Sequence, residues 1–183
     1  ERESDTVQPI SPYAASKRMG EIYGYIFSKL YSLPVVSLRY FNVFGPRQSL
    51  ENQYAVVVPK FITCLLTGTQ PPIYGDGNQE RDFTYIDNVV AANLLALVKE
   101  DIAGEIFNVA SAAPQSVNGL LEALSEITAI KKEPRYLDPR AGDVQKTEAA
   151  IEKAQRMLGW QGSVDFRAGL EKTVQWFKDN TPK

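Results

Sequence analysis

Tyr13 and Lys17 are the residues of this chain whose types and spacing are best suited to chemistry. Side chains four positions apart lie on one face of a helix, one turn from each other. A free tyrosine has a pKa of about 10 and is a poor base at neutral pH, but a neighbouring cation lowers the pKa of a phenol. A Tyr–Lys pair on a helix can therefore transfer protons. The spacing alone is weak evidence, because many helices contain such a pair by chance.

The residues around this pair predict the helix that it needs. Pro12 is tolerated in a first helical turn, where its absent N–H would have no intrahelical partner. Ser11 is a suitable N-cap. Apolar side chains continue at helical spacing to about Leu33, so the helix should be long.

A β-prone run at residues 35–41 follows this helix after a short break. A long helix that leads into a buried strand is half of a β-α-β unit, which predicts a parallel sheet. Ligands of parallel sheets bind beyond the carboxyl ends of the strands. The turn at residues 42–48 is therefore expected beside the helix face that carries Tyr13.

Short strands and helices alternate through the rest of the chain. Helices are predicted at residues 56–66, 88–99, 116–128, 147–158 and 166–179, and short strands at 71–74, 81–86, 105–110 and 135–137. Residues 1–10 are predicted to be a surface segment, residues 49–54 a loop, and Asp87 the N-cap of the helix that follows it. The pattern predicts one long parallel strand followed by a smaller mixed lobe.

Composition narrows the range of functions. The 183 residues suffice for one domain with a sizeable core, and the net charge is −2 without a basic cluster, so no nucleic-acid partner is expected. No apolar run approaches the roughly 20 residues of a membrane span, so no membrane partner is expected. The chain has no histidine, which removes His-based triads, and no metal site is predicted. Its one cysteine, Cys64, is predicted to lie in the core, in keeping with a cytoplasmic location.

Four motifs in order and spacing carry a family resemblance. They are residues 11–17 (SPYAASK), 38–47 (LRYFNVFGPR), 75–77 with 81–83 (GDG and RDF) and 140–143 (RAGD). The chain resembles the C-terminal half of an extended short-chain dehydrogenase/reductase, within the NAD-dependent nucleotide-sugar epimerase/dehydratase family. The subgroup it resembles most is the UDP-glucose or UDP-N-acetylglucosamine 4-epimerases. The resemblance covers essentially the whole chain.

The resemblance implies an α/β fold, the C-terminal part of an extended Rossmann-like fold with a small mixed α/β substrate-binding lobe. Residues 1–50 would be a remnant of the Rossmann-like domain, and residues 51–183 mainly the nucleotide-sugar-binding lobe, with some chain returning to the Rossmann part. The implied reaction is epimerisation of a UDP-sugar at C4 through a 4-keto intermediate.

The resemblance also implies roles for single residues. Tyr13 would be the catalytic base that takes the proton of the sugar 4-hydroxyl as hydride passes to NAD. Lys17 would bind the nicotinamide ribose and make the phenol a better base. The residues expected at the cofactor are Tyr13, Lys17, Tyr40, Asn42 and Val43. Those expected at the substrate are Asn42, Val57, Lys60, Ile73, Tyr74, Arg81, Arg140 and Asp143.

Two parts of the family pattern are absent from the given sequence. It contains neither the Gly-rich dinucleotide fingerprint nor the serine or threonine that precedes the catalytic tyrosine in the family. The chain also begins at Glu1 without a methionine, and we interpret it as a fragment. We therefore expect the isolated chain to bind NAD weakly or not at all and to be inactive.

Other interpretations stay open at this point. The parent enzyme could be a related nucleotide-sugar dehydratase or decarboxylase. The chain could instead be a non-catalytic nucleotide-sugar-binding or interaction fragment. Family members are commonly dimers through the helix that begins at Tyr13 together with one upstream helix, and only the former is in the given sequence. A homodimer is therefore one candidate assembly, and an uncovered apolar face or sheet edge would favour self-association.

Overall fold

The computed structural model describes residues 1–50, 57–140 and 142–180. Its first helix, α1 (Pro12–Tyr31), begins as predicted, because the Ser11 hydroxyl accepts a hydrogen bond from the Ala14 N–H at 3.1 Å. It ends at Ser32, which adopts the left-handed conformation with φ of 53°. Tyr13 and Lys17 therefore lie in the first two turns of α1.

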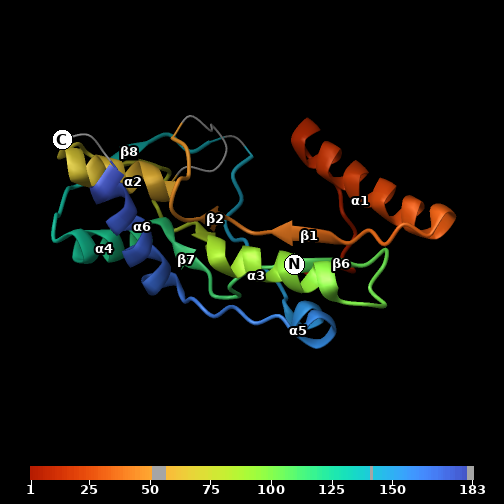
Figure 1. The fold of residues 1–183 in the computed structure, drawn as a ribbon. Coiled ribbons are helices and arrows are strands. Elements are labelled where there is room, and N and C mark those ends of the chain that lie inside the picture. Colours follow the sequence, from red (N-terminus) through yellow and green to blue (C-terminus); the bar gives the residue numbers. More distant parts are fainter. Residues whose placement is uncertain (51–56, 141, 181–183) are drawn as a thin grey trace.

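A parallel strand pair lies beneath α1 (Figure 1). Strand β1 (Ser37–Tyr40) pairs in parallel with β6 (Ile106–Val109), so the predicted parallel pairing is confirmed, although β1 is shorter than the long strand that the sequence predicted. Helices α3 (Ile86–Val98) and α5 (Glu152–Leu158) cover the other face of the pair. A buried core that includes Val89, Phe107, Leu158 and Trp160 joins β6 to these two helices.

A second group of elements forms a mixed lobe on the other side of the molecule (Figure 1). Its helices are α2 (Val57–Thr67), α4 (Val117–Thr128) and α6 (Phe166–Asn180). Its strands form three short pairs: β2 (Val43–Phe44) with β5 (Thr84–Tyr85) and β3 (Pro72–Tyr74) with β8 (Arg135–Leu137), both parallel, and β4 (Glu80–Arg81) with β7 (Gln115–Ser116), antiparallel. Cys64 is buried on α2, as predicted. The lobe has a core of its own, which includes Phe44, Phe61, Leu120 and Leu170.

The segment predicted as one helix at residues 147–158 is helical only from Glu152 onward. Backbone groups of the preceding residues bond to other parts of the chain instead: the Thr147 N–H donates to the Glu80 carbonyl at 3.1 Å, and the Ala149 N–H donates to the Asp82 carboxylate at 3.2 Å. These tertiary bonds hold the segment extended, which local helix propensity could not reveal.

Asp87 is not the N-cap that the sequence predicted. Helix α3 begins two residues earlier than predicted, at Ile86, with Tyr85 in the capping position and no side-chain cap bond. Asp87 lies in the first turn, where a carboxylate still interacts favourably with the helix dipole. The strand predicted at 81–86 is divided into two short strands, because β4 pairs with β7 and β5 pairs with β2. The predicted helix start at residue 56 and the loop residues 51–54 lie outside the described residues.

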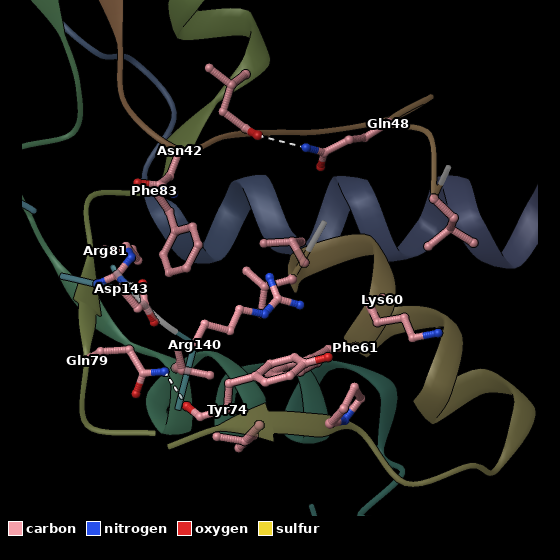
Figure 2. A pocket seen from close by; sticks show the side chains of 17 residues that line it. Asn42, Gln48, Lys60, Phe61, Tyr74, Gln79, Arg81, Phe83, Arg140 and Asp143 are labelled. Atoms are coloured by element: carbon pink, nitrogen blue, oxygen red, sulfur yellow. Dashed lines mark hydrogen bonds and ion pairs between the residues drawn. The ribbon is translucent and has the colours of Figure 1, made fainter. Parts of the chain in front are cut away.

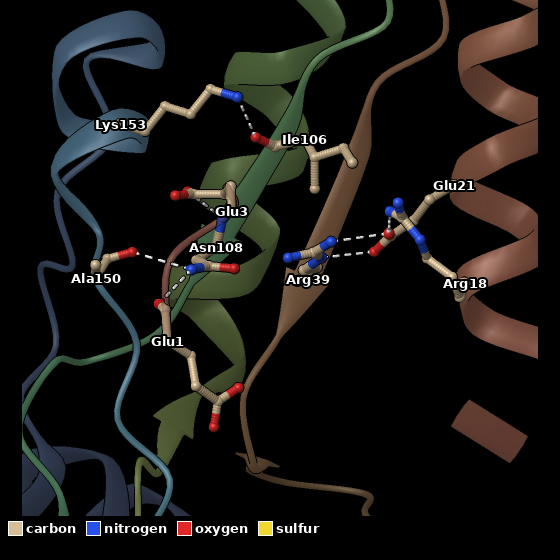
Figure 3. Close-up of polar contacts among 9 residues, drawn as sticks. All are labelled: Glu1, Glu3, Arg18, Glu21, Arg39, Ile106, Asn108, Ala150 and Lys153. Carbon is tan, nitrogen blue, oxygen red and sulfur yellow. Dashed lines mark hydrogen bonds and ion pairs between the residues drawn. The ribbon is translucent and has the colours of Figure 1, made fainter. Parts of the chain in front are cut away.

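Polar contacts connect the elements around the β1–β6 pair (Figure 3). Arg39 on β1 donates two hydrogen bonds to Glu21 on α1, at 2.6 and 2.9 Å. On β6, the Asn108 side-chain amide donates to the carbonyls of Glu1 and Ala150, and its backbone N–H donates to the Glu3 carboxylate. The first residues are thus held against β6, although most of the predicted surface segment is exposed.

Across residues 1–50, 57–140 and 142–180, no helix combines the length and the apolar character that crossing a membrane requires. The same residues contain no group of three or more His, Cys, Asp or Glu side chains arranged to hold a metal ion.

Candidate functional site

A cavity of about 340 Å³ opens in the lobe, next to the turn that follows β1 (Figure 2). Its walls come from six regions: the segment after β1, the start of α2, strand β3, the β4–β5 segment, the first residue of α4, and the segment that carries Arg140 and Asp143. The lining residues are Asn42, Val43, Gln48, Leu50, Val57, Val58, Lys60, Phe61, Pro72, Ile73, Tyr74, Gln79, Arg81, Phe83, Val117, Arg140 and Asp143. The volume is in the range of small-molecule sites.

Of the described residues, three cations and one carboxylate line this cavity: Lys60, Arg81, Arg140 and Asp143. Arg81 forms an ion pair with Asp143 and donates to the Glu80 carbonyl at 2.7 Å, and its side chain is only 12% exposed. These contacts hold the guanidinium in place at the cavity wall. The excess of cations makes the cavity suited to an anion, in a chain whose net charge is −2.

Arg140 lies over the ring of Tyr74, with its guanidinium carbon 3.9 Å from the ring centroid. A guanidinium can stack on an aromatic face while its N–H groups remain available at its edge. Hydrogen bonding and the positive charge of Arg140 lower the pKa of the Tyr74 phenol. Tyr74 and Arg140 together form one wall of the cavity.

The turn after β1 contributes Asn42, which has a φ of 29°, a left-handed conformation that asparagine tolerates better than most residues. Its side-chain oxygen accepts from the Thr147 hydroxyl at 3.5 Å, and its backbone carbonyl accepts from the Thr84 N–H at 3.2 Å. Gln48 donates to the Val43 carbonyl at 3.0 Å and closes the turn. The carboxyl end of β1 therefore carries lining residues, where ligand-binding loops of parallel sheets are expected.

The structure brings the residues predicted at the substrate into one place. Asn42, Val57, Lys60, Ile73, Tyr74, Arg81, Arg140 and Asp143 all line the cavity, and so does Val43, which was predicted at the cofactor. The other predicted cofactor residues, Tyr13, Lys17 and Tyr40, do not line it. Their roles, like those of the lining residues, remain predictions.

On α1, the Lys17 ammonium lies 5.2 Å from the centroid of the Tyr13 ring, and more than half of the Tyr13 surface is exposed. The helical spacing has thus placed a cation beside a phenol. The amino-terminal end of α1 is the end nearer to α2 (Figure 1). Tyr40 turns toward α3, where its hydroxyl donates to the Asn93 side chain at 3.0 Å.

Sequence reasoning missed four polar or aromatic residues of the cavity wall: Gln48 and Phe61, and the two residues on either side of Arg81, Gln79 and Phe83. Gln79 is 8% exposed and donates to the Tyr74 carbonyl at 2.7 Å. Gln79 and Phe83 both lie two positions from Arg81, on the same side of an extended segment, because side chains alternate along a strand. That alternation was the signal that could have found these two.

The residues present fit only part of an NAD site. Lys17 and Tyr13 could meet a nicotinamide ribose, since they place an ammonium and a hydroxyl side by side on α1. A dinucleotide site also needs a Gly-rich turn that lets backbone N–H groups approach the pyrophosphate, and the given sequence has none. The described residues therefore do not form a complete dinucleotide site.

The model of the NAD dependent epimerase/dehydratase family matches residues 1–110. The chain belongs to this family. The matched range includes the Tyr13–Lys17 pair, the turn after β1, and the β4–β5 segment that carries Arg81.

Individual members of the family resemble the chain over nearly all of its length. A putative UDP-glucose 4-epimerase of Methanocaldococcus jannaschii is 38% identical over 178 residues, which cover 97% of this chain and 57% of the relative. A dTDP-D-glucose 4,6-dehydratase of Bos taurus is 34% identical over 97% of this chain and 50% of its own length.

Among solved structures, a UDP-glucose 4-epimerase of Thermotoga maritima with UDP-glucose matches with a TM-score of 0.94 at 41% identity, covering 100% of this chain and 58% of that one. This match confirms the Rossmann-like α/β fold of the epimerases. The chain spans about half the length of the curated relatives it matches.

Proposed function

We propose that the cavity binds the UDP part of a nucleotide sugar, and that the chain is the substrate-binding part of an NAD-dependent UDP-sugar 4-epimerase. The observation that carries the proposal is that three cations, Lys60, Arg81 and Arg140, line the same cavity. Guanidinium groups hold phosphate oxygens through paired donors. In this arrangement Arg81 and Arg140 bind the diphosphate, Ile73 and Tyr74 border the base, and Asp143 supports Arg81 or accepts from a ribose hydroxyl.

In the proposed reaction the chain also supplies the base. The Tyr13 oxygen takes the proton of the sugar 4-hydroxyl, and the Lys17 ammonium stabilises the negative charge that develops on that oxygen. NAD, when bound, supplies the hydride acceptor and donor. Asn42, in the turn after β1, orients the sugar diphosphate, and Val43 borders the cofactor.

The proposal includes a limit on the chain as given. Because its sequence lacks the Gly-rich turn that receives the pyrophosphate, we propose that the 183-residue chain binds NAD weakly or not at all and does not turn over substrate. Binding of UDP alone would leave it a nucleotide-sugar-binding module.

Isothermal titration calorimetry of the purified chain with UDP and, separately, with NAD tests the proposal. We expect saturable binding of UDP and no measurable binding of NAD. Absence of UDP binding would contradict the assigned role of the cavity. Conversion of UDP-galactose to UDP-glucose by the purified chain would show that the proposed inactivity is wrong.

The dehydratase relative supports a second candidate, dehydration of a dTDP-sugar on the same scaffold. Titration with dTDP beside UDP separates the two candidates, because the two nucleotides differ in the ribose 2′-hydroxyl and the base methyl group. Tighter binding of dTDP would favour the dehydratase.

We also propose a homodimer through α1 and a cytoplasmic location. The apolar residues that α1 exposes support the homodimer. The single cysteine, Cys64, is a buried thiol, which supports a reducing compartment.

A further inference from the structure

We propose that Asp82, which is not among the residues that line the cavity, positions Arg81 for the diphosphate; this inference rests on the proposed function. Asp82 is fully buried, with an exposed fraction of 0%. Burial of a carboxylate is costly unless its oxygens accept hydrogen bonds. The hydrogen-bond donors to Asp82 therefore identify the segments that this residue connects.

Both carboxylate oxygens of Asp82 accept two hydrogen bonds. One oxygen accepts from the backbone N–H and the hydroxyl of Ser111, at 2.9 and 2.6 Å. The other accepts from the N–H groups of Ala112 and Ala149, at 3.1 and 3.2 Å. Asp82 thus ties the β4–β5 segment to the turn after β6 and to the extended segment before α5, two regions far apart in the sequence.

Arg81 and Asp82 are adjacent, and their side chains leave the backbone on opposite sides. Arg81 and Phe83 line the cavity, while Asp82 faces the interior. Because the Asp82 side chain is held at four points, the backbone of Arg81 is fixed relative to the cavity wall. With the backbone fixed, the position of the Arg81 guanidinium depends only on the side-chain rotamer and on the ion pair with Asp143.

The backbone of Asp82 connects to a second lining residue. The backbone N–H of Asp82 donates to the Thr147 hydroxyl oxygen at 3.3 Å, and that hydroxyl donates to the Asn42 side chain at 3.5 Å. Asn42 and Arg81 line the cavity from different segments, the turn after β1 and strand β4. Because the donor to Thr147 is the backbone of Asp82, this link between the turn after β1 and the Arg81 segment does not depend on the carboxylate, whose own effect is exerted through Arg81.

The Asp82→Asn variant tests this role because it keeps the shape of the side chain. The amide NH₂ would face N–H donors and could not accept their bonds. We expect affinity for UDP to fall on the order of tenfold, because the Arg81 guanidinium would no longer be aligned with the diphosphate. Affinity for uridine, which has no diphosphate, should change less than twofold. Calorimetry with UDP and uridine measures both effects on the 183-residue chain.

Asp87→Asn is the matched control, since it makes the same chemical change at an exposed position outside the cavity, and it should alter neither affinity. Arg81→Gln with Asp82→Asn should lose no more UDP affinity than Arg81→Gln alone, because Asp82 acts through Arg81. If Asp82→Asn does not fold, Ser111→Ala removes one donor only and should show a smaller loss, again for UDP alone.

The outcomes separate the inference from the function on which it rests. Equal losses for UDP and uridine, or no loss for UDP, would overturn the role of Asp82 while the original chain still prefers UDP. If the original chain binds UDP no better than uridine, the diphosphate role of the cavity is wrong, and the positioning role falls with it.

Discussion

Arg140 both stabilises the cavity wall and presents hydrogen-bond donors to the cavity. Its guanidinium covers the Tyr74 ring at 3.9 Å, a contact that stabilises the wall by about 1 kcal/mol in comparable cases. The planar group still presents N–H donors at its edge, and these are the groups that would meet a phosphate. Because Lys has no planar face, the same arrangement would not form with lysine at this position.

We predict that Arg140→Gln weakens UDP binding about tenfold and leaves uridine binding nearly unchanged. The variant removes a charged donor from the cavity and leaves a shorter, neutral polar side chain. Calorimetry with both ligands measures the difference. Arg167→Gln is the control, because Arg167 lies on α6, pairs with Glu126 and does not line the cavity. Equal losses in the two variants would show that general charge, rather than position, governs binding.

At the scale of elements, α1 differs from the other long helices because it has no buried residue. One side of it is held to the sheet: Glu21 bonds Arg39, the Ser28 hydroxyl donates to the Val35 carbonyl at 3.3 Å, and Gly24 packs close to Val35. A side chain at Gly24 would meet Val35 at 3.0 Å, so this glycine permits the approach of helix and strand. Few contacts therefore carry the docking of the helix that bears Tyr13 and Lys17.

Glu21 makes this docking sensitive to acid. The hydrogen bonds and charge of Arg39 and Arg18 hold its pKa below the ordinary value of 4.5, although partial burial opposes them. A carboxylate with a lowered folded-state pKa contributes stability above its unfolded pKa, and loses that contribution as the pH falls through the folded value. We predict that Glu21→Gln costs about 1 kcal/mol at pH 7, the upper range for a pair that is not fully buried, and less at pH 3.

Urea unfolding at pH 7 and pH 3, followed by circular dichroism, measures the Glu21 contribution. Glu122→Gln, at an exposed position of α4, serves as control. A Glu21→Gln deficit that stays constant between the two pH values would mean that packing, rather than charge, is responsible for the loss.

The sequence predicts elements that local interactions determine, and misses those that depend on contacts between distant parts of the chain. The start of α1 follows from Ser11 and Pro12, whose effects act within one helical turn. The extended segment at residues 147–150 depends on Glu80 and Asp82, some 65 positions earlier, so no local pattern contains it. For the site, the RDF and RAGD motifs led to Arg81 and Arg140, and alternation around Arg81 could have added Gln79 and Phe83, but only the folded chain shows that Gln48 and Phe61 line the same cavity.

At the scale of the whole molecule, two buried cores lie on either side of the strand ends. One packs β6 against α3 and α5, and the other lies among α2, α4 and α6. The cavity is in the second half, while Tyr13 and Lys17 are on the first, and the segment after β1 connects them (Figure 1). Any reaction that uses both would depend on how firmly the two halves hold their relative position.

The outer face of α1 leads to the prediction about assembly. Counting 100° per residue, Glu21, Gly24 and Ser28 face the sheet, and the opposite side of the helix carries an exposed stripe of Met19, Tyr23, Ile26 and Leu30. Burial of apolar surface stabilises association by about 25 cal/mol per Å². Two copies of one stripe can meet across a two-fold axis, because such an interface uses the same patch on both chains.

We therefore predict that the chain is a dimer in solution and that Ile26→Glu converts it to a monomer of 20.4 kDa, because the variant places a charge in the stripe. Glutamate is a good helix former, so α1 itself should persist. Light scattering coupled to size exclusion measures the mass, and circular dichroism checks the helix. Leu97→Glu, at an exposed position of α3, should leave the dimer intact. A monomeric original chain, or a dimer that both variants weaken equally, would show that α1 does not form the interface.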